Sequence, residues 1–243
     1  MDTSNNVKGV SKETWHKVIH AIEDSIPLYD HVNDLISFGK AQLARTYAVE
    51  NLQLSDDPMV LDGGIGPGTT SRLLLAKIKP RMLIGLDGSV KQLETARENL
   101  REYRDSLHPV NASFEYLPFK DGIFDGIVTC YALRDSLNLS RSISEYSRVC
   151  SEHGVFADVD IGKSDNPIKR TMSVLYVRYI MPLLAKAVIR RKIKGNPWKM
   201  IAPTYDTLPT NVSVLELMKH DFANVRTKEF LNDGIIVIHA RKS

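Results

Sequence analysis

The spacing of apolar residues changes along this chain, and the change predicts which segments are helices and which are strands. Near the N-terminus, Trp15, Val18 and Ile22 stand three or four positions apart, which predicts an amphipathic helix over residues 11–25. A second helix is predicted over residues 33–50. After it, short apolar runs typical of buried strands alternate with helical patterns, which favours an α/β fold with a parallel sheet and helices on both faces.

The alternation gives a series of strands and further helices. The strands are predicted at residues 58–61, 82–86, 110–112, 124–130, 155–159, 222–230 and 234–239. The helices are predicted at residues 71–79, 90–103, 139–150, 167–193 and 212–219. Pro182 has no backbone N–H, so it must kink or break the helix over residues 167–193. The link Asn232-Asp-Gly234 is typical of a hairpin turn between the last two strands.

The stretch Met59-Val-Leu-Asp-Gly-Gly-Ile-Gly-Pro-Gly-Thr-Thr70 joins a predicted strand, a glycine-rich turn and a helix start. Gly64, Gly66 and Gly68 alternate, so the backbone can turn tightly and approach a ligand without an intervening side chain. The hydroxyl residues 69–71 can cap the following helix, whose N-terminus would face the same ligand. The alternative is a glycine turn that serves only the fold.

An acid stands about twenty residues past this loop, where a ribose diol would lie. Asp87 ends the next apolar run, so the loop fits two adenosine-containing ligands, a dinucleotide and S-adenosylmethionine. A dinucleotide loop reads Gly-x-Gly-x-x-Gly around a pyrophosphate, which the carboxylate of Asp62 would repel. The same carboxylate suits a cationic amino group and a sulfonium, so the sequence favours S-adenosylmethionine. For Asp87 the alternative is a cap of the next helix, shared with Ser89.

Composition fits one globular unit with a sizeable core: the chain has 243 residues, 43% hydrophobic and 25% charged. Cys130 and Cys150 lie in apolar patterns and are interpreted as reduced core residues of a cytosolic protein. The first residues lack a signal-peptide pattern. No uncharged apolar run approaches the roughly 20 residues that span a bilayer. We expect a protein that is soluble or lies on a membrane surface.

Charge is unevenly distributed although the net charge is only +3. The segment between Asp165 and Asp206 has no acid, and its cations are Lys169, Arg170, Arg178, Lys186, Arg190, Arg191, Lys192, Lys194 and Lys199. Its apolar residues recur at helical spacing, which is typical of a helix that packs on the sheet and has a solvated basic face. The functional alternative is a lid, within residues 169–199, that covers a pocket and touches anionic lipid headgroups.

Several motifs resemble those of class I S-adenosylmethionine-dependent methyltransferases. They are the glycine loop, Asp87, Asn111-Ala112 and Leu117-Pro-Phe-x-Asp-Gly-x-Phe-Asp125. Three others look like the ubiquinone/menaquinone biosynthesis C-methyltransferase family, namely Tyr29-Asp30-x-x-Asn33-Asp34-x-x-Ser37-Phe38-Gly39, Leu133-Arg134-Asp135 and Gly234-Ile-Ile-Val-Ile-His239.

The resemblance implies a Rossmann-like class I methyltransferase sheet, mostly parallel with an antiparallel last strand, in a single domain over residues 1–243. Within that domain we expect an N-terminal helical cap at 1–50 and a cofactor-binding core at 51–161. A helical lid insertion is expected at 162–210, and a C-terminal helix and hairpin at 211–243.

The resemblance also implies S-adenosylmethionine as the cofactor and assigns residues to it. Asp62 and the glycines would hold the methionine moiety, and Asp87 would accept the ribose hydroxyls. Asn111 with Ala112 would face the adenine edge, since an amide can pair with an exocyclic amine. The expected cofactor-binding residues are Asp62, Gly63, Gly64, Gly66, Gly68, Asp87, Gly88, Ser89, Asn111, Ala112 and Tyr131.

Methyl transfer to a ring carbon requires alignment, exclusion of water and at least partial deprotonation of a phenolic oxygen. The resemblance places Arg134 and Tyr29 at the acceptor site, where Arg134 would stabilise a phenolate or orient a water. His31 is a proton acceptor by type, with a solvated or helix-capping role as its alternative. The expected catalytic residues are Tyr29, His31, Arg134 and Asp135, although Arg134-Asp135 would alternatively be a surface ion pair.

Other residues limit the choice of chemistry. Asp160 ends the fifth predicted strand, at the ligand-binding edge of such sheets, and matches an acidic position of the family; a loop cap is its alternative. The histidines lack metal-ligand spacing, so no metal is expected. The chain departs from the family at Asp135, where Asn is usual, and at Ala44, where Trp is usual. Ala202-Pro-Thr-Tyr205 matches the family poorly.

The expected activity is therefore S-adenosylmethionine-dependent C-methylation of a polyprenylated quinol precursor, a lipophilic small molecule. The alternatives are methylation of a phenol, sterol or amine, methylation of a nucleic acid, and a cofactor-binding subunit without activity. A nucleic acid is disfavoured because no added RNA-binding domain and no Asn-Pro-Pro-Tyr-like motif is present. We expect a cytoplasmic protein that lies peripherally at the inner face of the membrane; its oligomeric state is left open, with a homodimer as one option.

Overall fold

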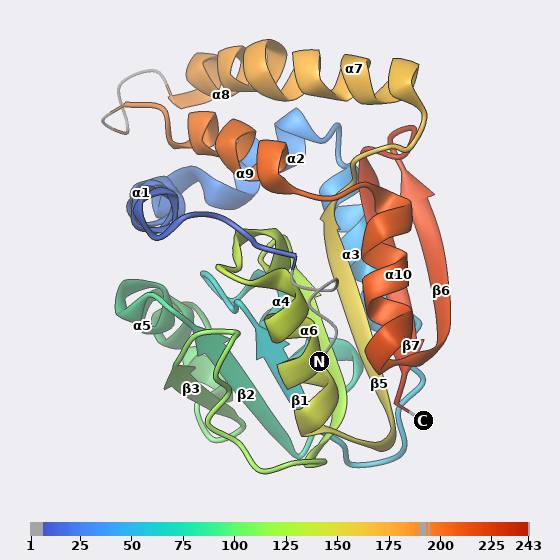
Figure 1. Ribbon diagram of the computed structural model, residues 1–243. Coiled ribbons are helices and arrows are strands. Elements are labelled where there is room, and N and C mark those ends of the chain that lie inside the picture. Colours follow the sequence, from blue (N-terminus) through green and yellow to red (C-terminus); the bar gives the residue numbers. More distant parts are fainter. Residues whose placement is uncertain (1–6, 190–192, 194, 243) are drawn as a thin grey trace.

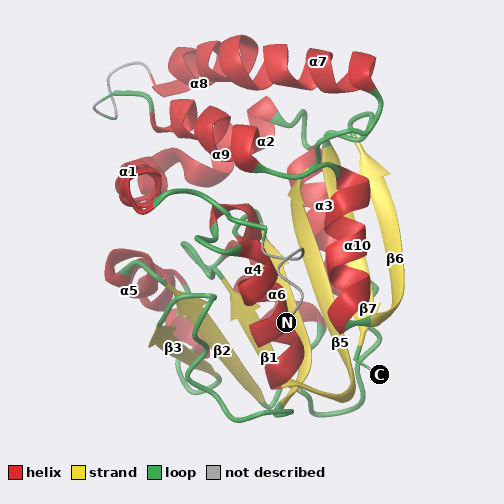
Figure 2. Cartoon of the chain, in the orientation of Figure 1, coloured by secondary structure: helices red, strands yellow, loops and turns green. Residues whose placement is uncertain are grey.

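A seven-stranded sheet organises the protein, as the computed structural model shows for residues 7–189, 193 and 195–242 (Figures 1 and 2). Its strands are β1 (Met59–Gly63), β2 (Met82–Asp87), β3 (Leu107–Asn111), β4 (Phe124–Cys130), β5 (Cys150–Ile161), β6 (Ala223–Phe230) and β7 (Ile235–Arg241). Their order is β3-β2-β1-β4-β5-β7-β6, and β7 runs antiparallel to both neighbours. The α/β fold with a mostly parallel sheet and an antiparallel last strand is confirmed.

Helices cover both faces of the sheet because its strands carry apolar side chains on each side. On one face lie α3 (Lys40–Glu50), α4 (Thr69–Lys77) and α5 (Val90–Asn99), which pack with residues such as Leu74 and Leu83. On the other lie α6 (Leu139–Val149) and α10 (Asn211–Asp221), around Tyr146 and Phe156. Cys130 and Cys150 are both buried and are free thiols.

A third group of helices lies over the carboxyl ends of the parallel strands, at the top of Figure 1. It consists of α1 (Lys12–Ser25), α2 (Tyr29–Ile36), α7 (Pro167–Leu175), α8 (Met181–Ile189) and α9 (Ile201–Thr207). We call this whole group the helical cap; it combines helices from the expected N-terminal cap (1–50) and from the expected lid insertion (162–210). It has its own apolar cluster, which joins Val32 of α2 to Val177, Met181 and Trp198. The Trp198 indole donates a 2.8 Å hydrogen bond to Asn33, so segments far apart in sequence are held together.

The prediction of one helix over residues 33–50 is wrong, because the chain forms two helices that meet at Gly39. Gly39 has φ +74°, a left-handed conformation that interrupts the helical path. The Ser37 hydroxyl accepts the Ala41 N–H at 3.0 Å and so stabilises the start of α3. The short helix α9 was not predicted at all.

The irregularity predicted at Pro182 is a π-helical turn, η5 (Tyr176–Ile180), between α7 and α8. The Met181 N–H bonds to the carbonyl of Tyr176, five residues back. The wider turn absorbs the missing N–H of the proline that follows. Among the described residues the helix runs to Ile189, and Ile193 is not helical, so the predicted end at residue 193 is wrong. Arg190, Arg191, Lys192 and Lys194 lie outside the described residues.

Candidate active site

The glycine loop between β1 and α4 folds back on the end of β2. The N–H groups of Gly64 and Ile65 donate to the Leu86 carbonyl at 2.7 and 2.9 Å. Gly64 has φ +85°, and a Cβ there would lie 2.3 Å from that of Ala132, so only glycine fits. Gly66 has φ +53° and open space where a Cβ would be. The loop therefore offers bare backbone toward a ligand.

The hydroxyls of residues 69–71 do not cap α4, contrary to the prediction. Gly68, with φ +95°, is the N-cap residue and has no side chain for the task. The hydroxyls instead tie the helix start to three other elements: Ser71 donates to Asp62 at 2.6 Å, Thr69 donates to Asp30 at 2.9 Å, and Thr70 accepts from Arg45 at 3.1 Å. The ligand-facing end of α4 is thereby fixed against β1, α2 and α3.

Asp62 is fully buried at the end of β1 with an unsatisfied oxygen. Its Oδ1 has no hydrogen-bond partner within the described part of the chain. Burial raises the pKa of this carboxyl to about 7, although Ser71 and the nearby Arg45 oppose the shift. A cationic group placed beside Oδ1 would satisfy it and favour the charged form.

Asp87 links the loop to the end of β2. Its Oδ2 accepts the Gly66 N–H at 3.0 Å, and its Oδ1 accepts the Ser89 N–H at 2.9 Å. The cap of α5 is Ser89, whose hydroxyl accepts the Gln92 N–H. Burial raises the pKa of Asp87, and these backbone hydrogen bonds oppose the shift. Helix α1 closes over this point, where Ser89 donates to Glu23 at 2.6 Å.

Asn111 and Ala112 lie one strand further, at the end of β3. Asn111 pairs with Asp87 in the parallel register, and its amide nitrogen donates to the Asp87 carbonyl at 2.9 Å. This side chain is exposed, and its oxygen accepts no hydrogen bond from the described residues. The Ala112 N–H also donates to the Asp87 carbonyl. Asn111 therefore presents an acceptor that suits an exocyclic amine.

Tyr131 stands at the end of β4 with φ +58°. Its hydroxyl donates to the Ala41 carbonyl at 3.1 Å, and the Arg45 guanidinium lies 5.5 Å from its ring centre. The next residue is Ala132, whose side chain meets Gly64. Sequence analysis missed Arg45; its only signal was a cation in the apolar face formed by Ala41, Ala44 and Ala48.

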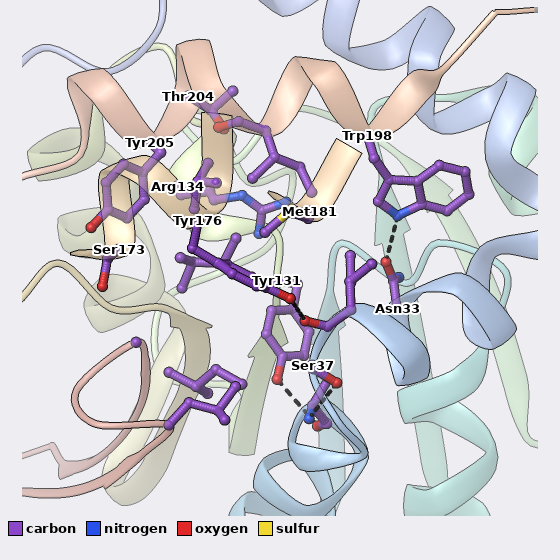
Figure 3. A pocket seen from close by; sticks show the side chains of 18 of the residues that line it. Asn33, Ser37, Tyr131, Arg134, Ser173, Tyr176, Met181, Trp198, Thr204 and Tyr205 are labelled. Carbon is purple, nitrogen blue, oxygen red and sulfur yellow. Dashed lines mark hydrogen bonds between the residues drawn. The ribbon is translucent and has the colours of Figure 1, made fainter. Parts of the chain in front are cut away.

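A cavity of about 410 Å³ lies under the helical cap, and Tyr131 is one of the residues that line it (Figure 3). Most of its wall is apolar, from Ile22, Val177 and Met181 among others. Its polar lining residues include Tyr29, Asn33, Tyr131, Arg134, Asp135, Lys169, Tyr176, Thr204 and Tyr205. The cavity thus has the character of a site for a largely apolar molecule with a polar end.

Arg134 is held at the polar end by two carboxylates. Its Nη1 donates to Asp160 Oδ1 at 2.8 Å, and its backbone N–H donates to Asp160 Oδ2 at 3.0 Å. Its Nη2 lies 3.6 Å from Asp135 Oδ2. The side chains of Arg134 and Asp135 are about one-tenth exposed, so the alternative of a surface ion pair is wrong. Asp160 therefore holds both the guanidinium and the backbone N–H of Arg134 in place.

Asp135 has a free acceptor in this buried cluster. Its Oδ1 has no hydrogen-bond partner in the described chain. Burial raises the pKa of the Asp135 carboxyl to about 6, although the charge of Arg134 opposes the shift. Burial also raises the pKa of Tyr29, against the effect of Arg45 and Arg134. A carboxyl with this pKa is ionised at neutral pH and can still take a proton.

The structure does not bring His31 to this cluster. Its side chain is exposed on α2 and does not line the cavity, whereas the neighbouring Tyr29 does. Among the described residues, no three side chains of His, Cys, Asp or Glu gather as a metal site. Tyr176, Thr204 and Trp198 line the cavity but were not among the expected site residues.

The chain is similar to known proteins over most of its length. The model of the ubiE/COQ5 methyltransferase family matches residues 8–242. The ubiquinone/menaquinone biosynthesis C-methyltransferase UbiE of Syntrophotalea carbinolica is 24% identical, over 88% of this chain and 89% of that protein. The 2-phytyl-1,4-naphtoquinone methyltransferase of a Nostoc species is 26% identical, over 90% and 97%.

The fold also matches solved structures. A chain in the complex between the Haloferax volcanii Trm112 methyltransferase activator and a putative methyltransferase superposes with a TM-score of 0.62. The match covers 96% of this chain and 99% of that chain at 14% identity, which shows a shared fold.

Proposed function

This chain belongs to the ubiE/COQ5 methyltransferase family, and we propose that it methylates a ring carbon of a lipophilic quinol. The family is one of S-adenosylmethionine-dependent methyltransferases, and membership implies use of that cofactor. The observation that carries the proposed acceptor is the largely apolar cavity of about 410 Å³ with Arg134 and Asp135 at its polar end. Relatives named for quinone biosynthesis support the same class of acceptor.

The loop residues fit S-adenosylmethionine because they offer complementary groups to each part of it. Asp62 Oδ1 is an orphaned buried acceptor for a cationic amino group, and Gly64 and Gly66 leave backbone open beside it. Asp87 would accept ribose hydroxyls, and Asn111 the adenine amine. Gly63, Gly68, Gly88, Ser89, Ala112 and Tyr131 would frame the ligand. When bound, the cofactor supplies an electrophilic methyl group on a sulfonium.

The cavity residues would prepare the acceptor. Asp135 Oδ1 takes the proton of the phenolic hydroxyl, and Arg134 stabilises the negative charge left on the oxygen. Asp160 keeps the guanidinium in place through its 2.8 Å contact. Tyr29 orients the same oxygen. The electron pair of the oxygen then moves through the ring to the nucleophilic carbon, which would form the new bond to the methyl group as the bond between methyl and sulfur breaks. The proton of that carbon then leaves to solvent, and Asp135 returns its proton to the oxygen.

Exclusion of water is the task of the helical cap. Val177 and Met181 line the cavity from one side, and Trp198, held by Asn33, closes it from another. A dry site strengthens the attraction between Arg134 and a phenolate.

The direct test is incubation of the purified protein with S-adenosylmethionine and a reduced, short-tailed demethylated quinol. We expect a product heavier by one methyl group, with the new carbon–carbon bond visible by NMR. Methylation of a phenol or sterol but not of the quinol would move the acceptor to that class. Cofactor binding without transfer to any of these acceptors would support a binding subunit.

A further inference from the structure

The helix run formed by α7, η5 and α8 has an apolar face that points away from the protein. Ile168, Met172, Leu175, Tyr179 and Leu183 recur every three or four residues and are each between 50% and 72% exposed. We call these five residues the outer stripe. The run Pro167–Ile189 has 23 residues and contains an 18-residue window with a mean hydropathy of 1.5, enough by length and composition to cross a membrane. Only 28% of its apolar window is buried.

The opposite face of the same run is fixed to the helical cap. Val177 and Met181 are buried in the apolar cluster of the cap. Lys169 pairs with Asp233 at 2.9 Å and Arg178 pairs with Asp206 at 2.8 Å. The run therefore lies along the top of the protein, as Figure 1 shows, and the five side chains of its outer stripe are exposed.

Several residues of the cavity wall are exposed, and one of them, Met172, belongs to the outer stripe. Met172 and Ile180 of the run, Phe38 before α3 and Leu231 of the β6–β7 turn all line the cavity and are also exposed. These four apolar side chains belong both to the wall of the cavity and to the exposed surface.

Charge decides which partner suits the surface. Nine cations and no acid lie between Asp165 and Asp206, and two of the cations, Lys169 and Arg178, are paired with acids. Lys186 and Lys199 are exposed and form no ion pair with the described residues. Two copies facing each other through this segment would oppose like charges. Anionic lipid headgroups complement the cations, while the outer stripe suits the acyl boundary beneath them.

We propose that the outer stripe docks this protein on the surface of an anionic lipid bilayer, with the mouth of the cavity turned toward the lipid. The proposed function enters only as the reason for docking, which would deliver an acceptor dissolved in the membrane to the cavity. The docking itself follows from exposure, helical spacing and charge.

The test compares two double variants in sedimentation with vesicles of phosphatidylglycerol and phosphatidylcholine. Tyr179→Gln/Leu183→Gln removes two residues of the outer stripe that do not line the cavity. Tyr116→Gln/Val212→Gln removes an equally exposed pair elsewhere on the surface. We expect the first variant to lose vesicle binding by about tenfold or more, and the second to bind like the wild type.

The readout needs no acceptor and no turnover, so it separates docking from the proposed chemistry. Equal binding of all three proteins overturns the proposal. A wild type that stays off the vesicles but forms a dimer, which only the stripe variant disrupts, also overturns it in favour of a second copy. Cofactor affinity, measured by calorimetry, should be the same in all three proteins and checks that each is folded.

Discussion

The Ser71 hydroxyl donates a 2.6 Å hydrogen bond to Oδ2 of Asp62, whereas Oδ1 of the same carboxyl has no partner among the described residues. One oxygen therefore joins β1 to α4, and the other is left for a ligand. Because burial raises the pKa of this carboxyl to about 7, its charge changes within the physiological range. Two predictions follow from this one group.

Affinity for S-adenosylmethionine should rise with pH through about 7 and level off above it, because only the ionised Asp62 attracts the ligand's positive charges. The slope below the transition should approach tenfold per pH unit at most. Calorimetry across this range tests it. Asp62→Asn should bind weakly and without this pH dependence; the same slope in the variant would assign the titration to another group.

Stability without the cofactor should change in the opposite direction. The pKa of Asp62 in the folded protein lies above its ordinary value of 3.8. The contribution of this group to the free energy of unfolding is therefore fully present below about pH 3.8 and is lost as pH rises through about 7. Asp62→Asn should therefore stabilise the free protein at about pH 8 by roughly 1–3 kcal/mol, and have little effect at low pH. Urea unfolding at both pH values measures this. A variant less stable than the wild type at the higher pH would contradict it.

Asp87→Ala should weaken cofactor binding by about tenfold to a hundredfold, because hydrogen bonds to a charged group contribute roughly 1.5–3 kcal/mol. The control is Asp105→Ala, which removes an exposed carboxyl paired with Arg104 far from the loop. Calorimetry on both folded variants decides the matter. An unchanged dissociation constant in Asp87→Ala would remove this residue from the ribose site.

Arg134→Ala should lower turnover far more than cofactor affinity, because its proposed partner is the acceptor oxygen. Arg134→Lys should restore little, since an ammonium cannot keep the Asp160 contact and reach the acceptor as a planar guanidinium does. Arg104→Ala is the matched control at an exposed position. Near-normal turnover of Arg134→Ala on the quinol would exclude the proposed role.

Asp135→Asn tests the proposed proton acceptor. Turnover of the wild type should rise with pH through about 6, as the carboxylate forms. The variant should lose this rise and turn over about tenfold more slowly or worse, while its cofactor affinity stays the same. A pH–rate profile measured for both proteins makes the comparison. If the rise persists in Asp135→Asn, a different group accepts the proton.

The features that depend on neighbouring residues in the sequence could be predicted. The alternation of apolar runs predicts the sheet, and the loop that carries Gly64 and Gly66 leads directly to Asp87 because consecutive parallel strands end at one edge. The break at Gly39 was missed because the apolar spacing continues across it, while a single left-handed residue redirects the chain.

A lid within residues 169–199 that covers a pocket was one alternative from the sequence, but the shape and lining of the cavity depend on contacts between distant segments. Tyr176 donates to the carbonyl of Ile36, and Trp198 to Asn33, across more than a hundred residues in each case. Neither pair leaves a periodic signal in the sequence. The burial of Arg134 between Asp135 and Asp160 is equally a product of tertiary packing, which is why a surface ion pair stood as an alternative.

The peptide between Tyr131 and Ala132 separates two sites: Ala132 contacts the glycine loop, and Tyr131 lines the cavity. We call this peptide the partition. Because the side chain of Ala132 meets Gly64, a larger residue there would push the loop out of shape. The methyl group of Ala132 is thus the largest side chain that fits between the partition and Gly64. A different acceptor would therefore have to be accommodated by the cap helices that line the cavity, because a larger side chain at residue 132 would displace the glycine loop.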